Sequence, residues 1–87
     1  MLRISEAEAD GKATLKLEGR VAGPWVQELQ SAAENWLTRG FALSLDVSGV
    51  TFADTGGVTL LRQLRLRAVK VCGASPFVTG LLGEYEP

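Results

Sequence analysis

Residues 43–61, LSLDVSGVTFADTGGVTLL, constrain the fold more than any other stretch of the chain. The first of them alternate between apolar and polar side chains, as a half-buried β-strand does. An acidic residue, a hydroxyl and two glycines follow as Asp54-Thr55-Gly56-Gly57, and apolar residues then recur at helical spacing. The stretch predicts a strand that passes into a helix through a tight corner.

The residues before this stretch predict a β-hairpin and then a helix. Residues 2–5 and 13–21 alternate between apolar and polar, and Asp10-Gly11 between them is typical of a two-residue hairpin turn. Pro24 suits the first position of a helix, and Arg39-Gly40 supplies a cation and a glycine at its end. Trp25 and Trp36 share one face of this helix, which we expect to face the core rather than a partner.

The residues after the hairpin and helix alternate between strand and helix patterns. Residues 41–47 predict a buried strand with a break at Ser48-Gly49, residues 58–68 a second helix, and residues 69–72 a short strand. Ser75-Pro76 predicts the start of a last helix. The order indicates an α/β fold with a mixed, mostly parallel sheet, an N-terminal hairpin and helices. We expect one core that contains Leu45, Val47, Leu61, Leu64, Val71 and Leu82.

The composition argues against catalysis, metal binding and nucleic-acid binding. The chain has no histidine and a single cysteine, Cys72, so it lacks the commonest general base and the usual ligands for zinc. Gly56-Gly57 does not belong to a phosphate-cradling loop motif. The net charge is −1 and no basic tract is present that would neutralise a row of phosphates. We therefore expect no catalytic residue, no metal site and no cofactor.

Three features of the sequence bear on where in the cell the protein is located. The first residues, MLRISEAEADGK, are polar and charged, unlike a signal peptide. No apolar run approaches the roughly 18 residues that span a bilayer. A single cysteine favours a reducing compartment. We expect one cytoplasmic domain over residues 1–87 that does not insert into a membrane.

The Asp-Thr-Gly-Gly corner has a structural and a functional interpretation. Either Asp54 or Thr55 can cap the first N–H groups of the helix, and a capped turn alone would account for them. Gly56 and Gly57 are poor helix formers, which indicates either a tight corner or close approach by another chain. A phosphoryl group on Thr55 would be tolerated at a helix N-terminus, yet its charge would repel a docked partner.

Residues 43–61 closely resemble the central segment of STAS domains (sulfate transporter and anti-sigma factor antagonist). The resemblance rests on Asp46-Val47-Ser48 and Asp54-Thr55-Gly56-Gly57 at their mutual spacing. Gly19-Arg20-Val21 also resembles the turn before the first helix of the family, and residues 71–78 resemble its fourth strand and last helix start. The resemblance implies a STAS fold, with helices packed chiefly on one face of the sheet, and a module that binds proteins.

The resemblance also implies roles for individual residues. In anti-sigma factor antagonists, the hydroxyl after the Asp is phosphorylated by a serine kinase, the anti-sigma factor, and this switches transcription regulation in bacteria. By position, Thr55 is the candidate phosphoacceptor, Asp54 its acidic neighbour, and Asp46 and Ser48 shape the loop. The partner-binding set is Asp46, Ser48, Asp54, Thr55, Gly56 and Gly57.

The Asp-Thr-Gly-Gly form has a second precedent. It resembles the STAS subunit of a phospholipid-transporting ABC system, which docks on the ATPase. The sequence favours the antagonist and keeps this subunit as the alternative. Three positions depart from the antagonist pattern: Gly56 replaces a second hydroxyl, Ala22 replaces an acidic residue, and Ala68 replaces a glycine before the fourth strand, which predicts a strained or shifted turn there.

A basic cluster follows the corner. It consists of Arg62, Arg65, Arg67 and Lys70. A solvated surface is the favoured interpretation, and contact with an acidic partner is the alternative.

Overall fold

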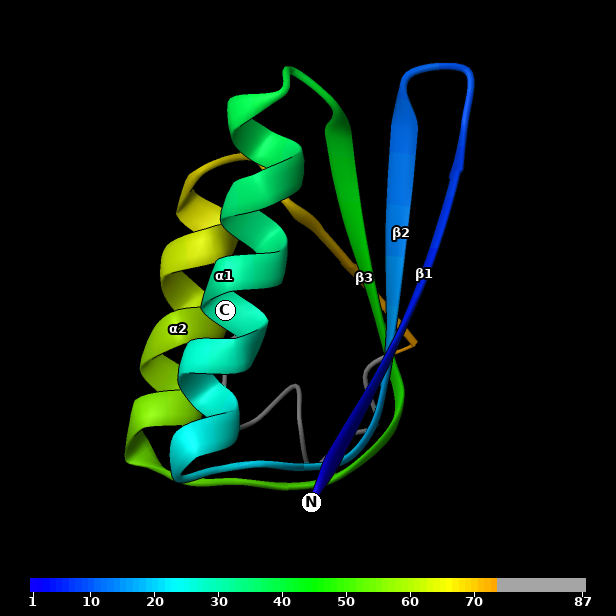
Figure 1. The fold of residues 1–87 in the computed structure, drawn as a ribbon. Coiled ribbons are helices and arrows are strands. Elements are labelled where there is room, and N and C mark those ends of the chain that lie inside the picture. Colours follow the sequence, from blue (N-terminus) through cyan, green and yellow to red (C-terminus); the bar gives the residue numbers. More distant parts are fainter. Residues whose placement is uncertain (74–87) are drawn as a thin grey trace, which may run out of the picture.

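The computed structural model describes residues 1–73, which form a four-stranded sheet and two helices. In chain order the elements are β1 (Leu2–Ala9), β2 (Lys12–Val21), α1 (Pro24–Thr38), β3 (Ala42–Ala53), α2 (Thr55–Leu66) and β4 (Lys70–Cys72). The sheet order is β1-β2-β3-β4; β1 pairs antiparallel with β2, and the other pairs are parallel. Both helices cover the same face of the sheet (Figure 1). The predicted α/β architecture is confirmed, and the helix predicted from Ser75-Pro76 lies outside the described residues.

The N-terminal hairpin turns where the sequence predicts. Asp10 and Gly11 link β1 to β2, and both have positive φ, 53° and 77°. Two residues of positive φ give a turn whose twist matches the twist of the flanking strands. The turn therefore fixes the register in which Ile4 pairs with Leu17.

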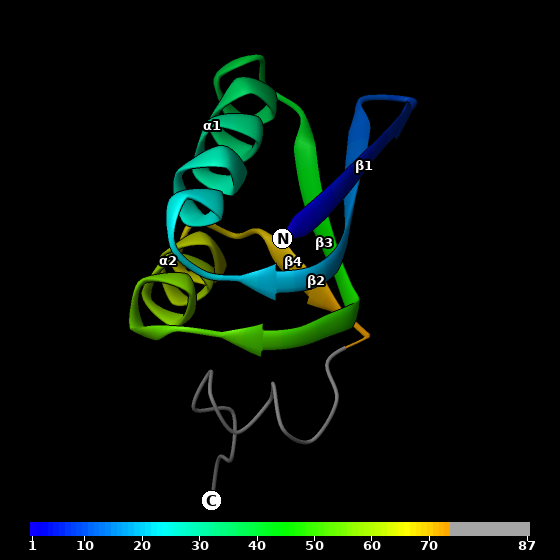
Figure 2. The same cartoon turned by 60° about the horizontal axis from the view of Figure 1, so that its bottom comes forward.

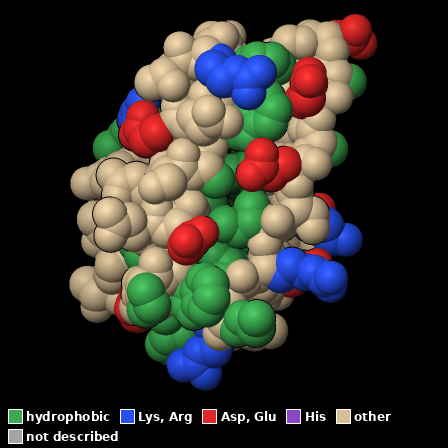
Figure 3. All heavy atoms as spheres, viewed as in Figure 1, with side chains coloured by type: hydrophobic (Ala, Val, Ile, Leu, Met, Phe, Trp, Pro, Cys, Tyr) green, Lys and Arg blue, Asp and Glu red, His purple; other side chains and the backbone are tan. Residues whose placement is uncertain are grey.

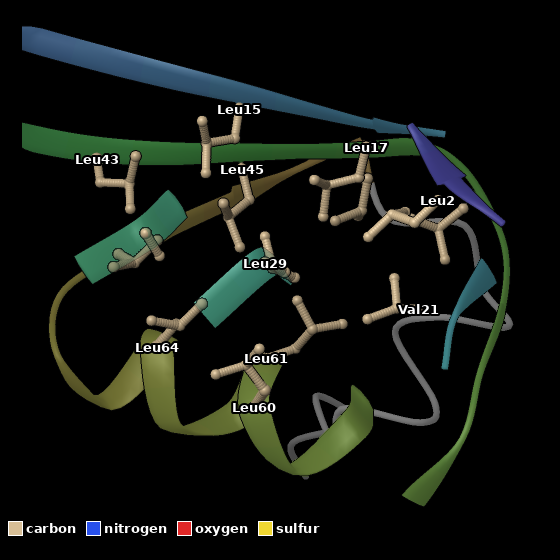
Figure 4. Close-up of a cluster of buried hydrophobic side chains, with 14 of the residues drawn as sticks. Leu2, Leu15, Leu17, Val21, Leu29, Leu43, Leu45, Leu60, Leu61 and Leu64 are labelled. Carbon is tan, nitrogen blue, oxygen red and sulfur yellow. The ribbon is translucent and has the colours of Figure 1, made fainter. Parts of the chain in front are cut away.

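The core lies between the sheet and the two helices. Alternate residues of β2 and β3, such as Leu15 and Leu45, point toward α1 and α2 and are fully buried (Figure 4). Among the predicted core residues, Leu45, Val47, Leu61 and Leu64 are buried and Val71 is partly buried against them. The remaining one, Leu82, lies outside the described residues.

The C-terminal half of α1 is joined to the hairpin through Trp36. This side chain is buried, and its Nε1–H donates a hydrogen bond to Glu6 on β1 at 3.0 Å. The guanidinium of Arg39 lies over the rings of Trp36 and Phe41, at 4.7 and 5.1 Å from their centroids. Trp25 is partly buried against the same core. The prediction that the tryptophan stripe faces the core is thus confirmed.

The predicted break at Ser48-Gly49 is a shift in strand pairing, and β3 continues through it to Ala53. Lys16 of β2 pairs with Asp46, but Glu18 pairs with Gly49, so β3 holds one extra residue here. Such a bulge bends a strand without ending it. Beyond it, β2 and β3 run beneath the helices and end close to where α1 and α2 begin (Figure 2).

The end of α2 differs from the predicted one. The helix stops at Leu66, whose side chain is 88% exposed and does not extend the apolar face as expected. Ala68 has a φ of 68°, in the left-handed region that favours glycine. The strained turn predicted from the absence of glycine at this position is confirmed.

Candidate functional site

Asp54 joins the N-termini of the two helices. It is the N-cap residue of α2, and its Oδ1 accepts a hydrogen bond from the Gly57 N–H at 2.8 Å. Its Oδ2 accepts another from the N–H of Gly23, the N-cap residue of α1, at 3.0 Å. The hydrogen bonds from Gly23 and Gly57 lower the pKa of Asp54. A single carboxylate thus holds both helix starts, and it remains charged to do so.

Thr55 is the first residue of α2, and it is exposed. Of the two residues that the sequence offers as the cap, Asp54 occupies the N-cap position and supplies the side-chain acceptor, and Thr55 does not. The side chain that accepts a hydrogen bond from the first N–H groups of a helix is that of the N-cap residue, not that of the first helical residue. Thr55 is therefore presented on the corner without being needed to close it.

The two glycines of the corner have different surroundings. A Cβ on Gly57 would lie 2.1 Å from the carbonyl oxygen of Val21, so β2 itself makes the close approach there. This corrects the expectation that both glycines leave room for a second chain. Gly56 is exposed, and a Cβ there would meet only ordinary contacts with Asp54 and Val26, at 3.5 and 3.9 Å.

Asp46 and Ser48 form a separate local structure. Asp46 Oδ1 accepts hydrogen bonds from the backbone N–H of Ser48 at 3.0 Å and from its hydroxyl at 2.7 Å. These bonds lower the pKa of Asp46. Asp46 pairs with Cys72 on β4, whereas Asp54 follows the pair of Ala53 with Val21. The six predicted partner-binding residues therefore fall into two groups, one within β3 and the other at the start of α2.

The structure adds residues that the sequence patterns did not mark as part of the site. Arg20 pairs with Phe52 across β2 and β3, and its guanidinium lies 4.7 Å from the centroid of the ring. Phe52 is 37% exposed and precedes the corner by two residues. Figure 3 shows hydrophobic side chains at the lower end of the molecule, the end at which both helices begin. Apolar alternation from Val50 would place Phe52 in the core, and its exposure follows from a second shift in the pairing of β2 with β3, between Gly19 and Arg20, which the sequence pattern does not show.

Residues 1–73 lack two other features that would indicate a function. No group of three or more histidine, cysteine, aspartate or glutamate residues there is arranged to hold a metal ion. No helix within the same range is long and apolar enough to cross a membrane.

The comparison with protein families identifies the class. A family model described as "Mlab, STAS domain" matches residues 4–85, and the chain belongs to the STAS domain family. STAS domains are in general binding modules that mediate protein–protein interaction. No curated protein matches the chain. The mixed four-stranded sheet with two helices described above is consistent with the STAS fold.

Proposed function

We propose that this STAS domain is a non-enzymatic docking module and that its partner binds the corner at the start of α2. The observation that carries the proposal is the presentation of Thr55. The residue is exposed, while Asp54 on one side and Gly57 on the other fix the backbone around it. A rigid, exposed platform loses little conformational entropy when a partner binds.

The ATPase of a phospholipid-transporting ABC system is the partner that the residues favour. Gly56 stands where antagonists carry a second hydroxyl, and Ala22 stands where they carry an acid beside the acceptor. The carboxylate of Asp54, which precedes Thr55 in the chain, accepts hydrogen bonds from two backbone N–H groups. The matching family description also names Mlab rather than an anti-sigma factor antagonist.

An anti-sigma factor with serine kinase activity is the second candidate partner, supported by the exposure of the Thr55 hydroxyl at a helix N-terminus. The helix dipole favours a phosphoryl group there, so the fold would survive modification. The added charge of about −1.5 to −2 would lie beside the Asp54 carboxylate and in the docking surface. Phosphorylation of Thr55 would then release the partner.

The test compares the affinity of Thr55→Glu with that of Thr59→Glu for the ATPase or kinase encoded beside this gene. Thr59 is exposed one turn further along α2, so the control has the same charge change on the same helix. We expect Thr55→Glu to weaken binding at least about tenfold and Thr59→Glu to weaken it less. Wild-type affinity in Thr55→Glu would refute the docking role of the corner.

A second measurement separates the two partners. The wild-type protein is incubated with the kinase and ATP, and the phosphorylated residue is located by mass spectrometry, with Thr55→Ala as the control. Phosphate on Thr55 in the wild type would support the antagonist. Tight binding to the ABC ATPase without phosphate transfer would support the transporter subunit.

A further inference from the structure

β1 is an edge strand, and within residues 1–73 no strand pairs with its outer side. It pairs with β2 over 8 consecutive residues without a bulge. Natural edge strands are commonly very short, or they carry proline, lysine or a bulge, and these features prevent another strand from pairing with them. β1 is longer than the roughly five or six residues of a usual strand and has no proline, lysine or bulge. Its edge is therefore open to a further strand.

The pairing with β2 determines which backbone groups of β1 point outward. The carbonyl of Met1 accepts a hydrogen bond from the N–H of Arg20 on β2 at 3.1 Å. In an antiparallel pair, residues that bond to the partner strand alternate with residues that do not. The odd-numbered residues of β1 therefore bond to β2. The even-numbered ones present their N–H and C=O groups to the outside, and they are Leu2, Ile4, Glu6 and Glu8.

The side chains of these outward residues select the charge of an incoming strand. Glu6 and Glu8 are both exposed, and they lie on the same side of β1. One oxygen of Glu6 accepts the hydrogen bond from Trp36, which fixes the position of this carboxylate. Glu8 makes no ion pair with another residue of the described range. Since opposite charges on directly facing residues stabilise a strand pair, this edge favours a strand with lysine or arginine at two positions separated by one residue.

A second copy of the chain fits this edge poorly. In an antiparallel pair of two β1 strands, the residues that face Glu6 and Glu8 come from the same side of β1 in the other copy. That side carries only apolar and acidic side chains, those of Leu2, Ile4, Glu6 and Glu8. Each carboxylate would face an apolar group or another carboxylate, and like charges directly opposite destabilise a pair. The charge therefore favours a basic partner over self-association.

A depression lies beside the outer half of β1, on the side of the sheet away from the helices. Its volume is about 340 Å³, and its lining includes Ala7, Ala9 and Thr14. Ala7 pairs with Thr14, whereas the neighbours of Thr14 in β2, Ala13 and Leu15, are buried on the helix side. Side chains alternate along a strand, so the residue between the two basic ones of an incoming strand points to the side of Ala7. The depression is placed to receive that side chain, and the two alanines favour an apolar one.

We propose that the outer edge of β1 binds an extended segment of a partner protein in which two basic residues flank an apolar one. The segment adds a strand to the sheet by hydrogen bonds to the outward backbone groups of β1, a recognised mode of peptide binding. Its basic side chains pair with Glu6 and Glu8, and its apolar side chain enters the depression. The hairpin turn lies at the end of the molecule away from the helix starts (Figure 1), so this surface is independent of the corner at Thr55.

The test measures the binding of a fluorescein-labelled peptide in which lysine alternates with valine, by anisotropy with the full-length protein. One control peptide has serine in place of valine, and another has glutamate in place of lysine. Glu8→Gln removes only the charge. Glu8→Pro also removes the outward N–H without taking a hydrogen bond from β2, and proline is tolerated at such positions of edge strands. The matched control is Glu28→Gln, at an exposed position of α1. Thermal melts verify that each variant is folded.

The proposal predicts that the lysine–valine peptide binds the wild type and that both control peptides bind more weakly. Glu8→Gln weakens the binding about threefold, Glu8→Pro at least about tenfold, and Glu28→Gln leaves it unchanged. On binding, amide hydrogen exchange slows at Ile4, Glu6 and Glu8, and changes little at Ser5 and Ala7, which already bond to β2.

Four results would overturn the proposal. The first is a lysine–valine peptide that does not bind the wild type. The second is equal affinity in Glu8→Pro and Glu8→Gln, which would exclude the backbone edge, and the third is unchanged exchange at the outward amides. The fourth is sedimentation that shows a dimer whose outward amides are protected without the peptide, because a second copy would then occupy the edge.

Discussion

The two ends of α2 are built differently. At the N-terminal end, Asp54 closes the helix with a hydrogen bond to Gly57 and ties it to α1 with another to Gly23. At the C-terminal end, the N–H of Arg67 bonds back to carbonyls of the last turn, and Ala68 then adopts a φ of 68°. At the N-terminal end, the Asp54 side chain and the glycines suit the positions that they occupy. At the C-terminal end, the turn forces Ala68, a residue with a Cβ, into a strained conformation.

Because the two ends of α2 are built differently, substitutions at the N-terminal end affect stability more than substitutions at the C-terminal end do. At the N-terminal end, the residues that shape the corner also join β2, α1 and α2, so most substitutions there would disturb the fold. Thr55 and Gly56 are the exceptions, because they are exposed and make no close contact with the core. At the C-terminal end, Leu66 is exposed and can change with little effect on folding.

The largest effect is expected at Gly57. In Gly57→Ala the new Cβ would lie 2.1 Å from the Val21 carbonyl oxygen, and since both atoms are fixed to backbone, β2 and α2 must move apart. We expect a loss of at least about 2 kcal/mol in the free energy of unfolding, measured by urea denaturation. Gly56→Ala is the control and should gain about 0.5–1 kcal/mol, because it has space for the methyl group. Equal effects at both glycines would mean that the N-terminal end is not tightly packed.

The next largest effect is a dependence of stability on pH that arises from the Asp54 carboxylate. Its pKa is lowered in the folded protein by the hydrogen bonds from Gly23 and Gly57, so its charged form contributes stability above its ordinary pKa of about 3.9. This contribution is lost as the pH falls through the lowered pKa. Asp54→Asn should therefore be less stable than the wild type at neutral pH, and the difference should shrink in acid. A difference that stays constant from pH 7 to about pH 3 would show that the charge does not matter.

At the C-terminal end of α2, we expect a substitution to increase stability instead of reducing it. In Ala68→Gly the positive φ no longer conflicts with a Cβ, and we expect the free energy of unfolding to rise by about 1 kcal/mol. Ala22→Gly is a suitable control, because it makes the same substitution at a position whose φ is not positive and should reduce stability. A loss of stability in Ala68→Gly would remove the contrast between the two ends.

The sequence predicts the elements well because the apolar periodicity of this chain matches its burial. Leu15, Leu45 and Leu61 are apolar at positions that their elements bury, so pattern alone locates the core. The bulge at Gly49 could not be read from the pattern, since Ser-Gly also marks turns. The register shift depends on how β2 pairs with β3, and pairing between distant segments leaves no local signal.

The candidate site was predicted by residue type but not by geometry. The corner at Asp54 was recognised, yet its bond to Gly23 joins residues 31 positions apart and could not be inferred from spacing. For the same reason, the close approach to Gly57 was assigned to another chain, when the Val21 carbonyl of β2 makes it. Hydroxyls and carboxylates both serve as caps, so the sequence leaves Asp54 and Thr55 as alternatives, and only the backbone decides which of the two neighbours is placed to cap the helix.

The smallest expected effect sharpens the comparison most, because it concerns Thr55, an exposed residue of the corner that does not cap the helix. Asp54 provides the cap and Thr55 is exposed, so Thr55→Ala should change the free energy of unfolding by no more than about 0.5 kcal/mol. A residue with a capping role would lose about 0.5–2 kcal/mol on the same substitution. Parallel thermal melts of Thr55→Ala and Asp54→Ala decide the matter, and only the latter should be clearly destabilised. If Thr55→Ala proved as damaging as Asp54→Ala, the hydroxyl would be part of the structure of the corner, and its exposure could no longer be taken as a reason to assign it to a partner.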